Sequence, residues 1–175
     1  MRQQLAIVTA LIVAFAATAR ADAPKVGDKA PDFKLTGSDG KEYSLADFSG
    51  KKAVVIAWFP KAFTGGCTAQ CKSMKEDGAA IRKFDVAYFT ASVDDVQKNT
   101  DFAKSLGLDY PILSDPTKKT AEAYGVVHEG RPFAERWTFY IGPDGVVKAV
   151  DQKVNTKEHA KDIAKQLEAI GVPKK

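Results

Sequence analysis

Two long runs of largely apolar residues stand out in the pattern of hydrophobic and polar positions along the chain. They are AVVIAWF at 53–59 and VAYFTASV at 86–93. Their length and their content of β-branched and aromatic residues predict strands that are buried on both faces. Pro60 ends the first run, because proline cannot continue a central hydrogen-bonded ladder. A shorter run, YPILSD at 110–115, predicts a third strand.

Segments with helical periodicity separate these strands. An acidic start and a glycine stop predict a helix over 94–107. Pro116, near the first position of PTKKTAEAYG, predicts a short helix over 116–125. Residues 67–84 have helical character that is weakened or broken near Gly78, and 156–171 forms an amphipathic helix that ends at Gly171.

Two hairpins complete the pattern. PDFKLTGSDGKEYSL at 31–45 and WTFYIGPDGVVKAV at 137–150 each place an Asp-Gly turn between extended segments. The whole pattern predicts an α/β fold with a mixed central sheet flanked by helices. In such sheets the functional site lies beyond the carboxyl ends of the strands. Cys67, just after the 53–59 strand and at the start of a helix, is in that position.

The N-terminus has the features of a secretory signal peptide. Arg2 precedes an apolar run at 5–19, which is followed by the small-x-small site Ala-Arg-Ala at 19–21. The run is shorter than the roughly 18 apolar residues expected of a spanning helix. We expect residues 1–21 to be removed after Ala21, and residues 22–175 to form one exported, periplasmic or secreted domain without stable membrane association. An uncleaved membrane anchor is the alternative.

Composition excludes one class of partner. The formal charge of +4 falls to +2 when Arg2 and Arg20 leave with the signal peptide. Lysines and acidic residues are interspersed, and no basic stripe alternates with aromatic residues. Nucleic acid is therefore not expected as a partner.

The only two cysteines, Cys67 and Cys71, follow a Thr-Gly-Gly sequence. A thiol attacks as the thiolate, and a helix N-terminus with a nearby cation can lower a cysteine pKa to about 3.5–7.5. Gly65 and Gly66 leave backbone amides uncovered, and the hydroxyl of Thr64 can donate to a thiolate or a bound oxygen. The sequence thus predicts an activated sulfur on an exposed turn. A buried structural thiol beside an ordinary glycine turn is the alternative.

The spacing of the cysteines argues against a structural disulfide. Helix positions four apart have Cβ atoms about 5–6 Å from each other, whereas a disulfide needs about 3.5–4.5 Å. The first turn must therefore unwind before Cys71 can reach Cys67. A loop this small contributes only about 2 kcal/mol to stability, against about 4.7 kcal/mol for a 100-residue loop. The pair is better suited to a bond that forms and breaks during turnover.

PKAFTGGC at 60–67 resembles the active-site pattern of the peroxiredoxins: Pro, three residues, Thr or Ser, two residues, Cys. The 26–52 hairpin region, the 92–116 segment and RWTFYIGPDG at 136–145 are also similar to that family, so the resemblance spans roughly 26–170. It implies a thioredoxin-like fold with an N-terminal β-hairpin extension. A resolving cysteine in the same helix resembles the Q-type, or bacterioferritin-comigratory, group. That group usually has four residues between its cysteines, whereas this chain has three. The group also commonly has a proline where this chain has Gly65.

The resemblance also implies roles for individual residues. Cys67 is the peroxidatic cysteine, which attacks a peroxide to give a sulfenic acid, and Pro60 shields it from solvent. Thr64 hydrogen-bonds the peroxide, and Arg136 lowers the pKa of the thiol and polarises the O–O bond. Cys71 resolves the sulfenic acid to an intramolecular disulfide, which protects Cys67 against overoxidation.

Further expectations concern the substrate and the partners. Gly66 and Phe63 are candidate substrate-binding residues, and simple packing is the equal alternative for Phe63. The implied substrate is hydrogen peroxide or an organic hydroperoxide, and the implied reductant is a thioredoxin-like protein or a small thiol. No cofactor or metal is implied. A resolving cysteine in the same chain removes the need for a dimer, so a monomer or weak dimer is expected.

Two other functions are compatible with a Cys-x₃-Cys pair. A thioredoxin-like copper-delivery protein would need a histidine before the final hairpin, because paired thiolates and an imidazole suit copper. This chain has Ala134, Glu135 and Arg136 there. A thiol–disulfide oxidoreductase usually has two residues between its cysteines and does not need Thr64 or Arg136.

Several other residues have plainer interpretations. Arg136, without the family resemblance, would be an ordinary surface ion-pair partner. His159 is predicted to be solvated on a polar helix face, and His128 to be a loop residue without a partner. Core positions are predicted for four aromatic residues: Trp58, Phe59, Trp137 and Phe139.

Overall fold

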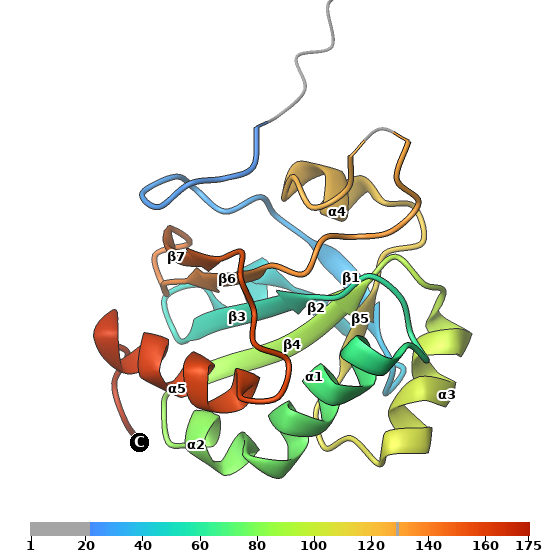
Figure 1. Ribbon diagram of the computed structural model, residues 1–175. Coiled ribbons are helices and arrows are strands. Elements are labelled where there is room, and N and C mark those ends of the chain that lie inside the picture. The colour runs from blue at the N-terminus through green and yellow to red at the C-terminus, as the bar shows by residue number, and fades with distance from the viewer. Residues whose placement is uncertain (1–21, 129) are drawn as a thin grey trace, which may run out of the picture.

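Seven strands form one mixed sheet in the computed structural model, which describes residues 22–128 and 130–175. The order across the sheet is β2-β1-β5-β4-β3-β6-β7 (Figure 1). The strands are β1 Lys34–Gly37, β2 Glu42–Ser44, β3 Ala53–Trp58, β4 Val86–Ser92, β5 Ile112–Ser114, β6 Thr138–Ile141 and β7 Val147–Asp151. The predicted signal peptide and its cleavage site lie outside the described residues.

Strand pairing confirms the predicted mixed sheet and both hairpins. β4 pairs in parallel with β3 and β5, whereas the β1–β2, β1–β5, β3–β6 and β6–β7 pairs are antiparallel. The predicted N-terminal hairpin is β1–β2, and the predicted final hairpin is β6–β7. The three parallel strands therefore end at one edge of the sheet, where Cys67 was expected.

The helices follow the predicted segments, with shifted ends. They are the 3-10 helix η1 Leu45–Phe48 and the helices α1 Gly65–Glu76, α2 Gly78–Arg82, α3 Val96–Leu106, α4 Lys119–Ala123 and α5 His159–Ala169. The predicted break near Gly78 is confirmed, because Asp77 leaves the helical conformation between α1 and α2. The expected start of α4 near Pro116 is wrong, because Lys118 has a left-handed backbone (φ +62°) and the helix begins after it. Within the described ranges, no helix has the length and apolar character to cross a membrane.

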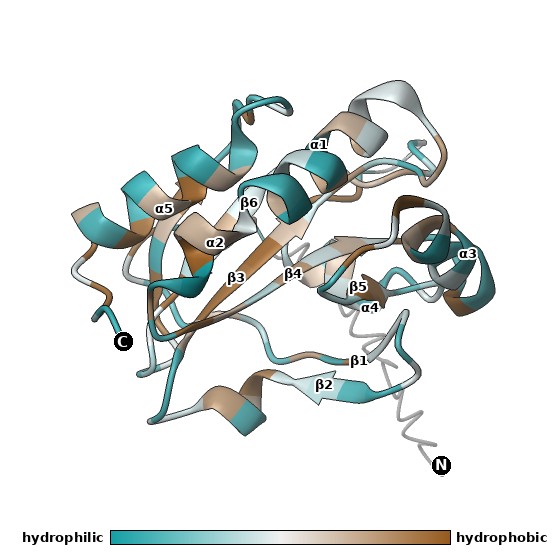
Figure 2. Ribbon diagram, turned by 90° about the horizontal axis from the view of Figure 1, so that it is seen from below, coloured by the Kyte–Doolittle hydropathy of each residue, from teal (hydrophilic) through white to brown (hydrophobic). Residues whose placement is uncertain are grey.

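Side chains of β3 alternate between two cores. Val54, Ile56 and Trp58 pack on the side of η1 and α4, whereas Ala53, Val55 and Ala57 pack against α1, α2 and α5. Figure 1 shows α4 on one side of the sheet and α1, α2 and α5 on the other. In Figure 2, β3 is hydrophobic along its length, and α5 has polar and apolar faces. The prediction of a strand buried on both faces is confirmed.

A third, smaller core lies beneath the carboxyl ends of the strands, between α1 and α3. It contains Phe59, Ala62, Cys67, Cys71, Phe102 and Ile112. The predicted core positions of Trp58, Phe59 and Phe139 are confirmed, since all three side chains are fully buried. Trp137 is only partly buried and packs at the edge of the first core, so its predicted core position is only partly correct.

His159 contradicts its predicted solvated position. It is the first residue of α5, where the helix packs onto the sheet, and it is fully buried. Its Nε2 lies 2.9 Å from the Thr138 hydroxyl on β6, and its Nδ1 has no partner among the described residues. Burial, and to a lesser degree the charge of Arg136, lowers the pKa of His159 from 6.5 to about 3. The residues next to His159 in sequence are mostly polar, and this pattern led to the prediction of a solvent-exposed side chain.

This buried histidine makes stability depend on pH. Between pH 6.5 and pH 3 the unfolded chain binds a proton at this position and the folded chain does not, so the free energy of unfolding falls as the pH falls. From pH 7 to pH 5 the expected loss from His159 alone is about 2 kcal/mol. Urea unfolding of the wild type and of His159→Gln at both pH values should show a smaller loss in the variant. Equal losses would contradict the neutral, buried state of the histidine.

Candidate active site

Cys67 is the third residue of α1. Thr64 has an extended backbone (φ −105°, ψ 152°) and precedes the helix as its N-cap, without a capping bond from its own side chain. The backbone N–H groups of the first turn therefore lack intrahelical acceptors, and they concentrate positive potential around the sulfur. The predicted position at a strand-to-helix turn is confirmed. The expected exposure is wrong, because the Cys67 side chain is fully buried in the core between α1 and α3.

A guanidinium contacts the sulfur. Nη2 of Arg136, from the segment before β6, donates to Cys67 Sγ at 3.4 Å. Nη1 of the same group donates to Oε1 of Gln70, which is fully buried one turn further along α1. The two Nη atoms of Arg136 thus donate to the sulfur of Cys67 and to the side-chain amide oxygen of Gln70, on one face of α1. Arg136 is therefore not the ordinary surface ion-pair partner of the alternative interpretation.

Gly66 makes room for this contact. A Cβ atom at Gly66 would lie 3.1 Å from Nη2 of Arg136, closer than most real Cβ contacts. A side chain at this position would press against the guanidinium that contacts the sulfur. Sequence reasoning assigned Gly66 to substrate binding through its amide, and the structure adds a packing reason for glycine.

Thr64 and Phe63 lie in the loop between β3 and α1. The Thr64 hydroxyl donates to the backbone oxygen of Lys61 at 2.9 Å, and not to the Cys67 sulfur, which was one of the two partners that the sequence suggested for it. Phe63 is 55% exposed and has a left-handed backbone (φ +63°), and its ring packs against Phe102 of α3 with centroids 5.0 Å apart. Of the two interpretations of Phe63, the structure shows the packing contact. Pro60 is half-buried at the start of the loop.

Cys71 lies one turn after Cys67 and is also fully buried; neither sulfur is in a disulfide. Burial raises the pKa of the Cys71 thiol from 9.0 to about 12. The phenol of Tyr110 donates to the backbone oxygen of Cys71 at 3.0 Å and anchors this turn of the helix. In the folded helix, Cys71 is therefore an unreactive thiol, and its predicted resolving role requires α1 to unwind.

Sequence reasoning missed three polar residues at this site. Gln70 could have been found, because it lies three positions after Cys67 and so shares its helix face. Tyr110 and Asp94, whose carboxylate accepts from the Ala62 amide in the loop before α1, could not, because they come from distant segments that only the folded sheet brings close. Among residues 22–128 and 130–175, no cluster of three or more histidine, cysteine or acidic side chains could hold a metal ion.

The chain is similar to known proteins in sequence and in fold. Residues 26–150 match the model of the AhpC/TSA family. Peroxiredoxin Bcp of Escherichia coli (strain K12) is 33% identical over 141 residues, which cover 77% of this chain and 90% of that protein. The crystal structure of peroxidoxin BcpB from Mycobacterium tuberculosis is 28% identical with a TM-score of 0.76, and covers 84% of this chain and 98% of that one. A structure of the Xanthomonas campestris bacterioferritin comigratory protein is 26% identical with a TM-score of 0.74, and covers 85% and 98% of the two chains.

Proposed function

The chain belongs to the AhpC/TSA family and is a thiol peroxidase with the thioredoxin-like fold of peroxiredoxins, and from this premise we propose that Cys67 is its peroxide-reducing residue. One observation carries the proposal: the guanidinium of Arg136 lies 3.4 Å from the Cys67 sulfur, at the start of a helix. A hydrogen bond to a charged group contributes about 1.5–3 kcal/mol, and a helix terminus about 0.3–1 kcal/mol. The guanidinium is therefore the larger contribution to holding the sulfur as a thiolate.

In the first step, the thiolate of Cys67 attacks the hydroxyl oxygen of a hydroperoxide. A sulfur–oxygen bond forms and the O–O bond breaks, which leaves a sulfenic acid and an alkoxide or hydroxide that takes up a proton. The positive charge of Arg136 stabilises the negative charge as it moves from sulfur to the leaving oxygen. Metal binding is disfavoured at the same place, because the guanidinium would repel a cation.

In the second step, Cys71 attacks the sulfenic acid, water leaves, and an intramolecular disulfide forms. Cβ atoms four positions apart on a helix are farther from each other than a disulfide allows, and this supports unwinding of the first turn before this step. Burial of Cys71 supports the same order, since its thiol can ionise only when the helix opens. A dithiol reductant, either a thioredoxin-like protein or a small thiol, then returns both cysteines to thiols.

The substrate is proposed to be hydrogen peroxide or an organic hydroperoxide. The Xanthomonas campestris relative is described as having alkyl peroxide reduction activity. The loop before α1 carries the half-exposed ring of Phe63, which offers an apolar contact to an alkyl group. Both substrate types share the O–O bond that the mechanism cleaves.

Cysteine variants test this mechanism. In mature protein with hydrogen peroxide and a dithiol, Cys67→Ser should lose peroxide consumption completely, because it lacks the attacking sulfur. Cys71→Ser should accumulate sulfenic and then sulfinic acid on Cys67, as measured by intact mass. Unchanged turnover in Cys67→Ser would refute the assignment. If Cys71→Ser turns over normally and is no easier to overoxidise, Cys71 is not the resolving residue.

We also propose that the enzyme acts outside the cytoplasm. The support is the basic start, the apolar run at 5–19 and the small-x-small site before Asp22. Protein recovered from the periplasm or medium of an expressing bacterium should begin at Asp22 when its N-terminus is sequenced. Full-length protein that remains in the cytoplasm or the membrane fraction would contradict this localisation.

A further inference from the structure

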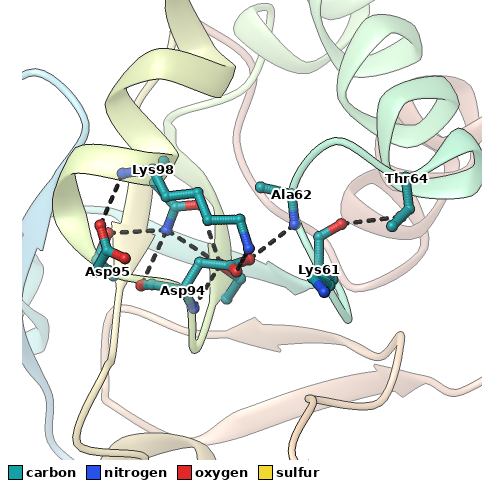
Figure 3. Close-up of polar contacts among 9 residues, drawn as sticks. Lys61, Ala62, Thr64, Asp94, Asp95 and Lys98 are labelled. Atoms are coloured by element: carbon teal, nitrogen blue, oxygen red, sulfur yellow. Dashed lines mark hydrogen bonds and ion pairs between the residues drawn. The ribbon is translucent and has the colours of Figure 1, made fainter.

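A single peptide unit in the loop before α1 is held on both sides. Figure 3 shows the N–H of Ala62 donating to a carboxylate oxygen of Asp94, and the hydroxyl of Thr64 donating to the carbonyl of Lys61. The two distances are 2.8 Å and 2.9 Å. This N–H and this carbonyl belong to the same planar peptide bond. The Asp94 carboxylate therefore fixes the orientation of this peptide plane. The direction of the Lys61 carbonyl follows from that plane, and so does the direction of the Thr64 hydroxyl that donates to it.

Asp94 itself is held by Ser92 at the end of β4 and by Lys98 of α3. Its side chain is 9% exposed, forms an ion pair with Lys98, and accepts a hydrogen bond from Ser92 at 3.1 Å. Ser92 bonds in turn to Asn99 of α3, which donates to Ser114 of β5 at 2.9 Å. This polar chain is mostly buried and connects the carboxyl ends of the parallel strands β4 and β5 to the loop that follows β3.

The loop needs such support because of Phe63. This residue lies between Ala62 and Thr64 and has a left-handed backbone that bulky side chains rarely adopt. Such a conformation persists only where its surroundings hold it. Asp94 holds the preceding amide, and Phe102 packs against the ring.

The hydrogen bond to Lys61 decides what Thr64 can do. A carbonyl oxygen only accepts, so the hydroxyl proton is committed to it and the Thr64 oxygen is left as an acceptor. A hydroperoxide has an O–H group to donate, whereas a thiolate has none. Accepting that proton would hold the peroxide by its hydroxyl oxygen, which is the atom that the sulfur attacks.

We propose that Asp94 is a positioning residue of the peroxidase reaction, which acts through the Lys61–Ala62 peptide to keep the Thr64 hydroxyl as an acceptor for the hydroperoxide O–H. This inference rests on the proposed function of Cys67. A carboxylate on the N–H side of the peptide also polarises the bond and strengthens its carbonyl as an acceptor for Thr64. Asp94 does not contact the substrate in this arrangement.

The test compares two reactions of the same sulfur. In mature protein with Cys71→Ser, the rate constants of Cys67 with hydrogen peroxide and with iodoacetamide are measured by mass spectrometry at one pH. Asp94→Ala should lower the peroxide rate by up to about 10²-fold, the scale expected for a misplaced contact, and leave alkylation unchanged. Asp94→Asn should lose less, because its amide oxygen can still accept from Ala62.

The neighbouring Asp95 provides the matched control. It caps α3 by accepting from the amide of Lys98 at 2.8 Å, whereas the amide of Ala62 donates to Asp94. Asp95→Ala should lower the thermal stability and leave the ratio of the two rates unchanged. An equal change of that ratio in both aspartate variants would overturn the proposal.

A double-mutant cycle tests the route through Thr64. If Asp94 acts through that hydroxyl, Thr64→Val with Asp94→Ala should react with peroxide no more slowly than Thr64→Val alone. Additive losses, or equal losses in peroxidation and alkylation, would make Asp94 a purely structural residue. If Asp94→Ala does not fold, Asp94→Asn completes the same cycle. Failure of the proposed function is distinct, since Cys67 in the parent protein would then not react with peroxide at all.

Discussion

The contact between the Arg136 guanidinium and the Cys67 sulfur depends on the pairing of two strands that are distant in sequence. Cys67 follows β3, Arg136 precedes β6, and these strands are antiparallel neighbours. The amide of Trp58 donates to the carbonyl of Trp137 at 2.8 Å and continues their pairing toward the site. Any change that shifts the β3–β6 register would move the guanidinium away from the sulfur, so the contact at the edge of the sheet depends on strand pairing in its buried core.

Both cysteines are buried, and this constrains the catalytic cycle. Cys67 is buried where an arginine and uncapped amides stabilise negative charge, whereas Cys71 lies where burial alone dominates and keeps the thiol protonated. The two thiols on one helix therefore have different surroundings, and the different roles proposed for them rest on this difference. Gly65, for which an added Cβ would meet nothing within 4 Å, is the first residue of α1, whose first turn unwinds in the proposed mechanism.

Local patterns were enough to predict most of the fold. Continuous apolar runs, glycine turns and helix end signals located the strands, hairpins and helices, because these signals act over a few residues. The start of α4 was misplaced, since Lys118 adopts a backbone that its residue type does not suggest. The burial of His159 was missed because the packing of α5 on the sheet, and not the polarity of its neighbours, decides which side faces inward.

The residues of the candidate site that belong to a sequence motif could be predicted. The residues that reach the site only through tertiary contacts could not. The family resemblance predicted that Arg136 acts on Cys67, and the two side chains are in contact in the structure. Asp94 lies 32 residues from Ala62, and no spacing rule connects a carboxylate to one amide across that separation. The direction of the Thr64 hydrogen bond could not be predicted either, because it depends on the backbone conformation of the loop around Lys61.

The most direct measurement of the central claim is the rate constant of Cys67 with hydrogen peroxide in the wild type and in Arg136→Gln. The loss of one such electrostatic donor predicts a fall of about 10²–10³-fold. Arg131→Gln is the matched control, because Arg131 lies in the same segment, is 66% exposed, and pairs with Glu135. This control should react at the wild-type rate. Equal rates in Arg136→Gln and the wild type would contradict the view that this guanidinium activates the sulfur.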